Sequence, residues 1–282
     1  MQVAHRLKQV VCGAVLACAV TIPGISAAAE DVAARLESLA AGDHRSAENK
    51  ARNDARHPVE TLAFFGIRPD MTVVELWPST GWYTEILAPF LRDEGRYIAA
   101  GFDQDADSDY LKKNLAAFDA KLKADPELYD RVEITELAPP DKVDIAPAGS
   151  ADMVLTFRNL HNWMMRGQLE TVIAAAHKAL KPGGILGVVE HRADPNATPD
   201  AAAKSGYVSE AEAIRIIEAA GFELVEKSEV NANPRDTKDH EGGVWALPPT
   251  LRHGDKDREK YLAIGESDRM TLLFRKPAET RD

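Results

Sequence analysis

One stretch of the sequence, residues 71–92, constrains the fold more than any other. It reads MTVVELWPSTGWYTEILAPFLR. The first six residues form a short apolar run with β-branched side chains and one acid, Glu75, which predicts a buried strand. A Pro-Ser-Thr-Gly cluster follows, and apolar residues then recur at helical spacing. A strand, tight loop and helix in this order place free backbone N–H groups at the carboxyl edge of a sheet, where α/β folds bind ligands.

The rest of the chain alternates between strand and helix patterns. Further strands are predicted at residues 96–102, 131–137, 151–157, 185–190, 222–230 and 270–275. Helices are predicted at residues 30–41, 58–65, 110–122, 168–180 and 208–220. This alternation predicts an α/β protein with a mostly parallel sheet covered on both faces. We expect an N-terminal helical segment at residues 30–69 and one larger domain at residues 70–282.

The first 29 residues differ in kind from the rest. Arg6 and Lys8 form a basic start, an apolar run covers residues 10–20, and small residues follow. This pattern is typical of a secretory signal peptide, so we expect residues 1–29 to be removed and the mature protein to be periplasmic or secreted. The apolar run is short for a transmembrane helix. A retained anchor and a lipid on Cys18 are the alternatives.

Composition excludes several classes of function. The chain has 34 basic and 45 acidic residues, a formal net charge of −11, which argues against sequence-independent nucleic-acid binding. Both cysteines, Cys12 and Cys18, lie in the expected signal peptide. The mature chain would therefore have no disulfide, cysteine nucleophile or cysteine-based zinc site. After removal of the signal peptide, we expect no stable membrane insertion. The sequence does not indicate an oligomeric state.

Three motifs in the correct order carry a family resemblance. The loop at 75–81 (ELWPSTG) looks like an acid-plus-glycine cofactor loop, the segment at 150–154 (SADMV) looks like a fourth-strand entry, and that at 180–184 (LKPGG) looks like the lead into a fifth strand. With the long connection before the last strand, the chain resembles the class I S-adenosylmethionine-dependent methyltransferases and a bacterial group of exported methyltransferase-like proteins. The resemblance implies a seven-stranded Rossmann-like methyltransferase sheet whose last strand is antiparallel, with helices on both faces.

The resemblance also implies a site for S-adenosyl-L-methionine around the first loop. Ser79, Thr80 and Gly81 would approach the methionine end of this cofactor, beside Trp77. Glu75 would brace the loop or bind the amino group. Backbone N–H groups at a helix start suit the zwitterionic end of such a molecule.

The remaining cofactor contacts implied by the resemblance lie after the next strands. Asp103 would be the nearest acid for the ribose hydroxyls. Thr135, Glu136 and Leu137 would lie near the adenine, and Asn159 follows the fourth strand at the same edge. Methyl transfer from a sulfonium is an in-line displacement, so positioning would supply most of the acceleration.

The first loop departs from the family pattern at two positions. Trp77 and Ser79 stand where the family usually has glycines, and only Gly81 remains. Since glycine permits close backbone approach and positive φ, these replacements alter the loop. Because Trp77 precedes Pro78, it is expected to be extended. The acid expected at the end of the second strand falls on Gly101.

Two histidines are the candidate catalytic residues. His161 follows the fourth strand and His191 the fifth, so both are expected at the carboxyl edge of the sheet. A histidine base is the functional interpretation, because its pKa lies near neutral pH. Ordinary loop histidines are the alternative. With Glu190 and His240 they could also form a metal site, although no helical ligand spacing supports one, and we expect none.

Three further features have open interpretations. The charged residues 44–57 predict a solvated linker, or a basic flap over an anionic group. The segment 231–266 is expected to be a lid or an exposed loop. Aromatic side chains are expected to line an acceptor pocket or to belong to the core: Trp77, Trp82, Tyr83 and Trp163.

Together these features predict an exported S-adenosylmethionine-dependent methyltransferase that acts on a small molecule by direct methyl transfer. The alternative is a non-catalytic periplasmic protein that binds a small molecule and retains the methyltransferase fold. A dehydrogenase is disfavoured because no G-x-G-x-x-G follows the first strand. A hydrolase is disfavoured because the chain has no G-x-S-x-G elbow.

Overall fold

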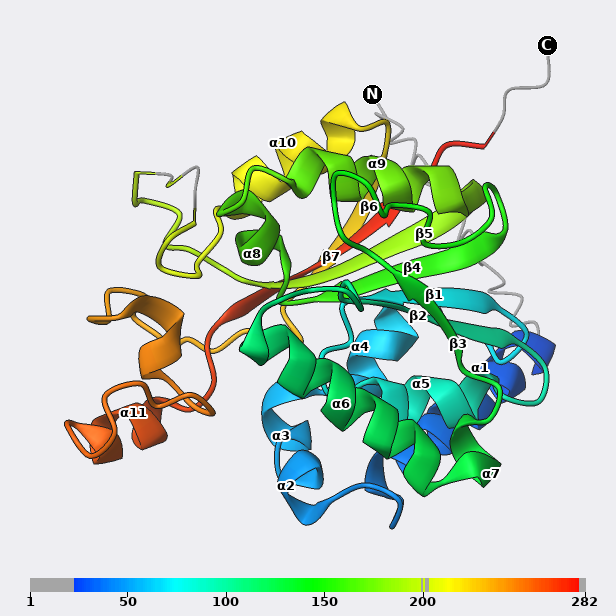
Figure 1. The fold of residues 1–282 in the computed structure, drawn as a ribbon, viewed down its shortest axis with the longest axis horizontal. Coiled ribbons are helices and arrows are strands. Elements are labelled where there is room, and N and C mark those ends of the chain that lie inside the picture. Colours follow the sequence, from blue (N-terminus) through cyan, green and yellow to red (C-terminus); the bar gives the residue numbers. More distant parts are fainter. Residues whose placement is uncertain (1–22, 199, 201–202, 279–282) are drawn as a thin grey trace, which may run out of the picture.

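A single seven-stranded sheet organises the protein (Figure 1). The computed structural model describes residues 23–198, 200 and 203–278. The strands are β1 (Thr72–Leu76), β2 (Arg96–Gly101), β3 (Glu133–Glu136), β4 (Ala151–Phe157), β5 (Leu180–His191), β6 (Glu223–Ser228) and β7 (Arg269–Arg275). Their order across the sheet is β3-β2-β1-β4-β5-β7-β6.

The direction of the strands confirms the predicted fold class. Pairs of neighbours from β3 to β5 are parallel, whereas β7 is antiparallel to both β5 and β6. In the register, Val74 of β1 lies between Ile98 and Val154. The carboxyl ends of β1, β2, β4 and β5 therefore meet at one edge, and the beginning of β7 joins them there.

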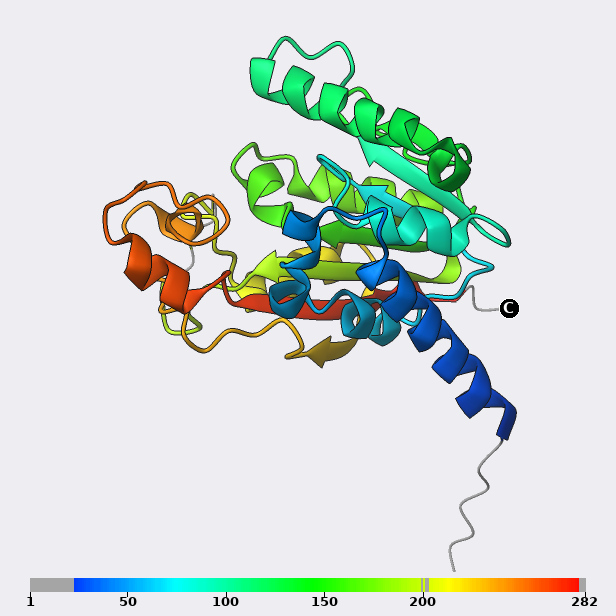
Figure 2. The same cartoon turned by 90° about the horizontal axis from the view of Figure 1, so that it is seen from below.

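Helices cover both faces of the sheet. They are α1 (Pro23–Ala41), α2 (Ala47–Lys50), α3 (Asn53–Arg56), α4 (Pro58–Phe64), α5 (Thr84–Leu91), α6 (Asp109–Ala124), α7 (Pro126–Tyr129), α8 (Leu160–Met164), α9 (Leu169–Ala179), α10 (Glu210–Ala219), α11 (Arg258–Ile264) and a 3-10 turn η1 (Gly243–Ala246). Figure 1 shows α9 and α10 on one side of the sheet and α5 and α6 on the other. Figure 2 shows the N-terminal helices lying across the second face.

The core has one apolar cluster on each face, because successive strand side chains point to opposite faces. In β1, Val73 packs with Leu36, Leu62 and other residues of the α1, α4 and α5 side. Val74 packs with the α8, α9 and α10 side. The N-terminal helical segment and the sheet thus share one core.

Among the described residues, no helix is both long enough and apolar enough to cross a bilayer.

Several element boundaries differ from those predicted. Helix α1 begins at Pro23 rather than residue 30, and β5 begins at Leu180 rather than residue 185. Ser209 caps α10 as expected, accepting a hydrogen bond from the backbone N–H of Glu212. The expected signal peptide falls mostly on residues 1–22, outside the described residues, so its removal stays a prediction.

The charged segment 44–57 is docked rather than solvated. Arg45 is buried, and its Nε donates to Glu85 of α5 at 3.1 Å. The guanidinium groups of Arg45 and Arg56 lie 4.7 and 4.6 Å from the centre of the Trp82 ring. The interpretation as a solvated linker is therefore wrong for these two arginines, because ion pairing and ring stacking fix their side chains.

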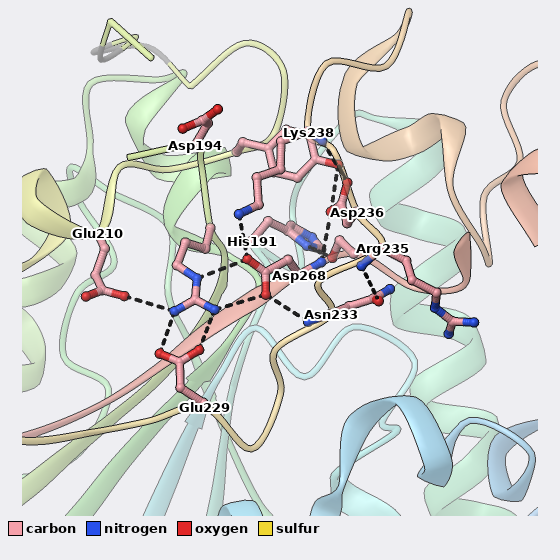
Figure 3. A network of polar contacts seen from close by, with 12 residues as sticks. His191, Asp194, Glu210, Glu229, Asn233, Arg235, Asp236, Lys238 and Asp268 are labelled. Atoms are coloured by element: carbon pink, nitrogen blue, oxygen red, sulfur yellow. Dashed lines mark hydrogen bonds and ion pairs between the residues drawn. The ribbon is translucent and has the colours of Figure 1, made fainter. Parts of the chain in front are cut away.

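The segment 231–266 is anchored at the edge of the sheet by a polar network around Asp268 (Figure 3). Lys238 forms an ion pair with Asp268 at 2.8 Å, and the backbone N–H of Asn233 donates to the same carboxylate at 2.8 Å. The backbone N–H of Asp268 donates to Asp236, also at 2.8 Å. Side chains of this segment line a cavity described below, so it is more than an exposed loop.

Candidate functional site

The loop after β1 keeps a backbone shape that suits glycine. Trp77, Ser79 and Gly81 have φ values of +49°, +56° and +80°. The expectation of an extended Trp77 is therefore wrong: the turn from β1 into α5 overrides the bias of a residue that precedes proline. The side-chain amide of Asn159, after β4, supports this shape by donating to the carbonyl oxygens of Leu76 at 3.1 Å and Trp77 at 3.4 Å.

The indole of Trp77 is seated in the sheet edge beside β3. Its Nε1 donates to the carbonyl oxygen of Leu137 at 2.8 Å. The ring lies 5.0 Å from that of Phe102 and 5.1 Å from that of Trp163, and Arg166 covers it at 5.3 Å. Only 8% of Trp77 is exposed. A flat nitrogen heterocycle of the chain itself thus fills the place beside Leu137.

A cavity of about 220 Å³ borders this indole. It lies at the carboxyl ends of β1, β2 and β4 and has a mixed aromatic and polar lining. We call it the loop cavity, and it is lined by Glu75, Trp77, Pro78, Ser79, Trp82, Tyr83, Phe102, Tyr110, Leu111, Phe157, Arg158, Asn159, Asn162 and Arg166. Of the predicted cofactor residues it brings together Glu75, Trp77, Ser79 and Asn159.

The other predicted cofactor residues do not line the loop cavity. Asp103 and Glu136 both pair with Lys142, at 2.6 and 2.5 Å. The hydroxyl of Thr135 donates to the carbonyl oxygen of Ile145 at 2.9 Å. Thr80 is exposed, Gly81 faces the Phe118 ring, and Leu137 contributes its carbonyl oxygen to Trp77. Asp103, the acid proposed to bind the ribose hydroxyls, is thus paired with Lys142 instead.

Glu75 is a buried acid at the base of the loop cavity. Its carboxyl accepts hydrogen bonds from the hydroxyls of Tyr97 at 2.5 Å and Thr84 at 3.4 Å. Burial raises the pKa of Glu75 to about 7, although both hydrogen bonds act in the opposite direction. The side chain is therefore able to hold or release a proton near neutral pH.

Replacement of Glu75 by glutamine is expected to change how stability depends on pH. Between about pH 4.5 and 7 the unfolded chain releases the Glu75 proton while the folded chain keeps it, so the wild type loses stability as pH rises. The shift corresponds to about 3 kcal/mol in total. Urea unfolding from pH 4.5 to 8 should show this loss in the wild type and not in Glu75→Gln. If stability changed with pH equally in the two proteins, the raised pKa of Glu75 would be contradicted.

A second cavity, of about 210 Å³, lies at the ends of β4, β5 and β7. We call it the arginine cavity, and it is lined by Arg52, Arg56, Arg158, His161, His191, Val244, Trp245, Pro248, Pro249, Thr250, Glu266 and Arg269. Arg158 lines both cavities, so they are neighbours. The predicted catalytic histidines therefore meet at the sheet edge, but they lie in this second cavity.

Both histidines have fixed ring orientations. His161 Nδ1 lies 3.0 Å from the buried carboxylate of Glu190, and His191 Nδ1 lies 2.5 Å from the hydroxyl of Ser267. A carboxylate only accepts, so Nδ1 of His161 donates to it, and in the neutral imidazole Nε2 is left as an acceptor. Burial, with the nearby His161 and Arg269, holds the pKa of His191 well below its usual value. His161 has the orientation of a general base.

His161, Glu190 and His191 also offer three ligand atoms within 4.8 Å of one another. His240, the other expected ligand, instead pairs with Asp236 at 2.9 Å. The guanidinium groups that line the same cavity oppose a bound cation electrostatically. We therefore interpret the three side chains as a hydrogen-bonded group rather than a metal centre.

Two residues of this cavity, Arg158 and Arg269, were not predicted from the sequence. Arg158 directly follows the fourth strand, so the signal that selected His161 was available for it as well. Arg269 begins β7, and it reaches the carboxyl edge only because β7 runs antiparallel to β5. Arg52 and Arg56 belong to the segment 44–57 interpreted as a linker or a basic flap, and both line the arginine cavity.

The residues present do not fit S-adenosylmethionine in the extended arrangement that the resemblance implies. The methionine end has a suitable loop, with Glu75 and Asn159 beside it. However, the adenine was expected next to Leu137, where the Trp77 indole is bound. The ribose lacks its acid, because Asp103 pairs with Lys142.

Known proteins resemble this chain in structure rather than in sequence. No family model matches the sequence, and no curated protein matches it either. A SAM-dependent methyltransferase from Aquifex aeolicus superposes with a TM-score of 0.53 at 15% identity, over 86% of this chain and 98% of that one. A putative sarcosine dimethylglycine methyltransferase from Galdieria sulphuraria gives 0.53 at 12% identity, over 89% and 99%.

One of the similar structures belongs to a protein that is named for a reaction other than methyl transfer. The [4+2]-cyclase SpnF superposes with a TM-score of 0.54 at 17% identity, over 88% of this chain and 94% of that one. At such identities the likeness concerns the fold, and a fold hosts more than one chemistry. This chain has the fold of the class I SAM-dependent methyltransferases.

Proposed function

We propose that this protein binds a small molecule at the carboxyl edge of a methyltransferase-fold sheet and does not take up S-adenosylmethionine in the family's manner. One observation carries the proposal: the indole of Trp77 is hydrogen-bonded to Leu137, where the adenine was expected. The two adjoining cavities of about 220 and 210 Å³ give room for a small ligand. The proposal corresponds to a binding protein that retains the fold.

Export is part of the same proposal. The basic start, apolar run and small residues of the first 29 positions support a signal peptide and a periplasmic or secreted protein. S-adenosylmethionine is made in the cytosol, so an exported protein would lack a supply of it. The net charge of −11 supports a small-molecule partner over a nucleic acid.

A S-adenosylmethionine-dependent methyltransferase for a small molecule is the second candidate. It is favoured by the β1 loop, because Trp77 and Ser79 keep positive φ values like that of Gly81. It is also favoured by His161: with Nδ1 bonded to Glu190, its Nε2 could take a proton from the substrate group that receives the methyl. This candidate requires the Trp77 side chain to move away from Leu137.

Calorimetry with S-adenosylmethionine separates the two candidates. We expect no binding by the purified protein up to about 1 mM. Micromolar binding that is abolished by Gly81→Val would contradict the proposal and support the methyltransferase. That variant is a suitable control, because a Cβ at Gly81 would lie 3.0 Å from the Phe118 ring and φ is +80°. Circular dichroism would check that the variant is folded.

A further inference from the structure

The arginine cavity gathers four guanidinium groups from separate parts of the chain. Arg52 lies between α2 and α3, and Arg56 is in α3. Arg158 follows β4, and Arg269 begins β7. All four line the same cavity of about 210 Å³. The fold therefore brings together charges that repel one another at its ligand-binding edge.

One carboxylate faces these four cations among the residues that line the cavity. Glu266 accepts from Nε of Arg52 at 2.6 Å and from Nε of Arg56 at 3.4 Å, and it also pairs with Arg269. A single negative charge thus serves three guanidinium groups. The lining keeps an excess of positive charge even when Glu266 is counted.

Two groups of the cavity keep unused hydrogen-bond donors. Arg158 donates its backbone N–H to the carbonyl oxygen of Val189, whereas its side chain forms no hydrogen bond or ion pair with the described part of the chain. Its backbone has a φ of +61°, which is uncommon for a residue other than glycine. Nε of Arg269 is buried without a partner, although this side chain is almost wholly enclosed. A buried donor without an acceptor, such as this Nε, is unfavourable, whereas the half-buried Arg158 side chain is free to bind a ligand.

The pKa values reflect the same crowding of positive charge. Burial, with Arg269 nearby, lowers the pKa of Arg158 to about 10. Burial, with Arg158 nearby, holds the pKa of Arg56 well below its usual value. With a pKa of about 10, Arg158 remains charged at neutral pH, so an anion in the cavity would relieve the repulsion.

Part of the cavity lining is apolar. It is formed by Val244, Trp245, Pro248 and Pro249 of the segment 231–266. The network around Asp268 holds this segment against the sheet (Figure 3). The Trp245 ring lies 5.9 Å from that of His161, so the apolar wall and the histidines are adjacent.

We propose that the arginine cavity binds the oxyanion head, a carboxylate or a phosphate, of a small molecule whose apolar part packs against Trp245 and the two prolines. Arg158 would donate to the oxyanion, since a guanidinium group matches carboxylate and phosphate oxygens in pairs, and Arg269 would add positive charge beside it. The inference rests on the proposed function, because it names the chemistry of the ligand. It applies equally to the substrate of a methyltransferase.

Calorimetry with four probes at constant ionic strength tests the inference. Benzoate and phenyl phosphate carry an oxyanion on an apolar ring, benzyl alcohol is neutral, and inorganic phosphate has no apolar part. We expect benzoate or phenyl phosphate to bind, and the tighter of the two identifies the head group. Benzyl alcohol should not bind, and inorganic phosphate should bind more weakly.

Variants of Arg158 locate the binding. Arg158→Gln is expected to weaken binding of the tighter probe at least about tenfold, and Arg158→Lys by less, because lysine keeps the charge but not the paired donors. Since the Arg158 side chain has no protein partner, thermal unfolding should confirm that both variants are folded. Arg68→Gln is the matched control, because the exposed Arg68 side chain pairs with Asp70 before β1. This variant should bind the probe with the same affinity as the wild type.

The inference is overturned if no oxyanion probe binds up to about 10 mM, if benzyl alcohol binds as tightly as benzoate and phenyl phosphate, or if Arg158→Gln binds like Arg68→Gln. These outcomes leave the titration with S-adenosylmethionine unaffected. Conversely, micromolar binding of S-adenosylmethionine would refute the proposed function and leave the oxyanion site in place.

Discussion

Trp77→Gly is expected to give the protein an affinity for S-adenosylmethionine that the wild type lacks. The substitution removes the indole and frees the carbonyl oxygen of Leu137 beside the ring of Phe102. It also restores a glycine at a position whose φ is already +49°. Calorimetry should show a gain of at least about a hundredfold, from no binding at about 1 mM to a Kd of about 10 µM or below.

The stability of Trp77→Gly is expected to fall at the same time. Removing a buried tryptophan costs about 3–5 kcal/mol, while relief of the left-handed backbone returns about 1 kcal/mol. Urea unfolding would confirm that the variant remains folded during titration. Trp245→Ala is the control, because it removes an indole of the arginine cavity and leaves the Trp77 seat intact. A folded Trp77→Gly that does not bind would show that the indole is not what excludes the cofactor.

Glu266→Gln is expected to cause a large loss of stability. The carboxylate pairs with three arginines, and the amide would leave them without a counter-charge in a buried setting. Loss of one partner from a buried ion pair costs about 3–5 kcal/mol. Urea unfolding at pH 7 measures the change. Glu229→Gln is the comparison, because its exposed pair with Arg192 should contribute about 1 kcal/mol or less.

The pH dependence of this contribution has a defined sign. The arginines hold the pKa of Glu266 well below its usual value, despite the opposing effect of burial. Its contribution is therefore present above about pH 4.3, the ordinary value of a glutamate, and is lost as the pH falls below it. A Glu266→Gln protein as stable as the wild type at pH 7 would contradict the role of this carboxylate.

The sequence was sufficient to predict the fold because its signals are local. The apolar run at 72–76 and the breaker cluster after it predict β1 and its loop, and the same logic predicts every later strand. The antiparallel β7 followed from the family resemblance. Boundaries were less accurate, since the beginning of β5 depends on pairing between Leu180 and Ala151 across the sheet.

The location of the candidate site could be predicted from the sequence, but its side-chain contacts could not. Residues at the ends of strands, such as Glu75, Asn159 and His161, lie in cavities because the topology puts strand ends there. The seat of the Trp77 indole depends on a contact with Leu137, sixty positions later in the chain. No local pattern encodes such a contact.

Long-range ion pairs were the other source of error. The pattern of residues 44–57 is that of a polar surface, yet Arg45 is buried against Glu85, forty positions away. Asp103 was expected at the ribose, but Lys142 binds it across the turn after β3. In each case a distant partner decides where a charged side chain lies, so sequence spacing alone cannot place it.

NMR of the tryptophan indole N–H groups reports whether the Trp77 indole is bonded to Leu137 in solution. The protein has four tryptophans, so ¹⁵N labelling gives four assignable indole signals. We expect the Trp77 signal to exchange slowly with solvent, because its N–H is bonded to Leu137, and to stay unchanged with S-adenosylmethionine at about 1 mM. A Trp77 signal that exchanges rapidly, or that shifts at micromolar cofactor, would contradict the account.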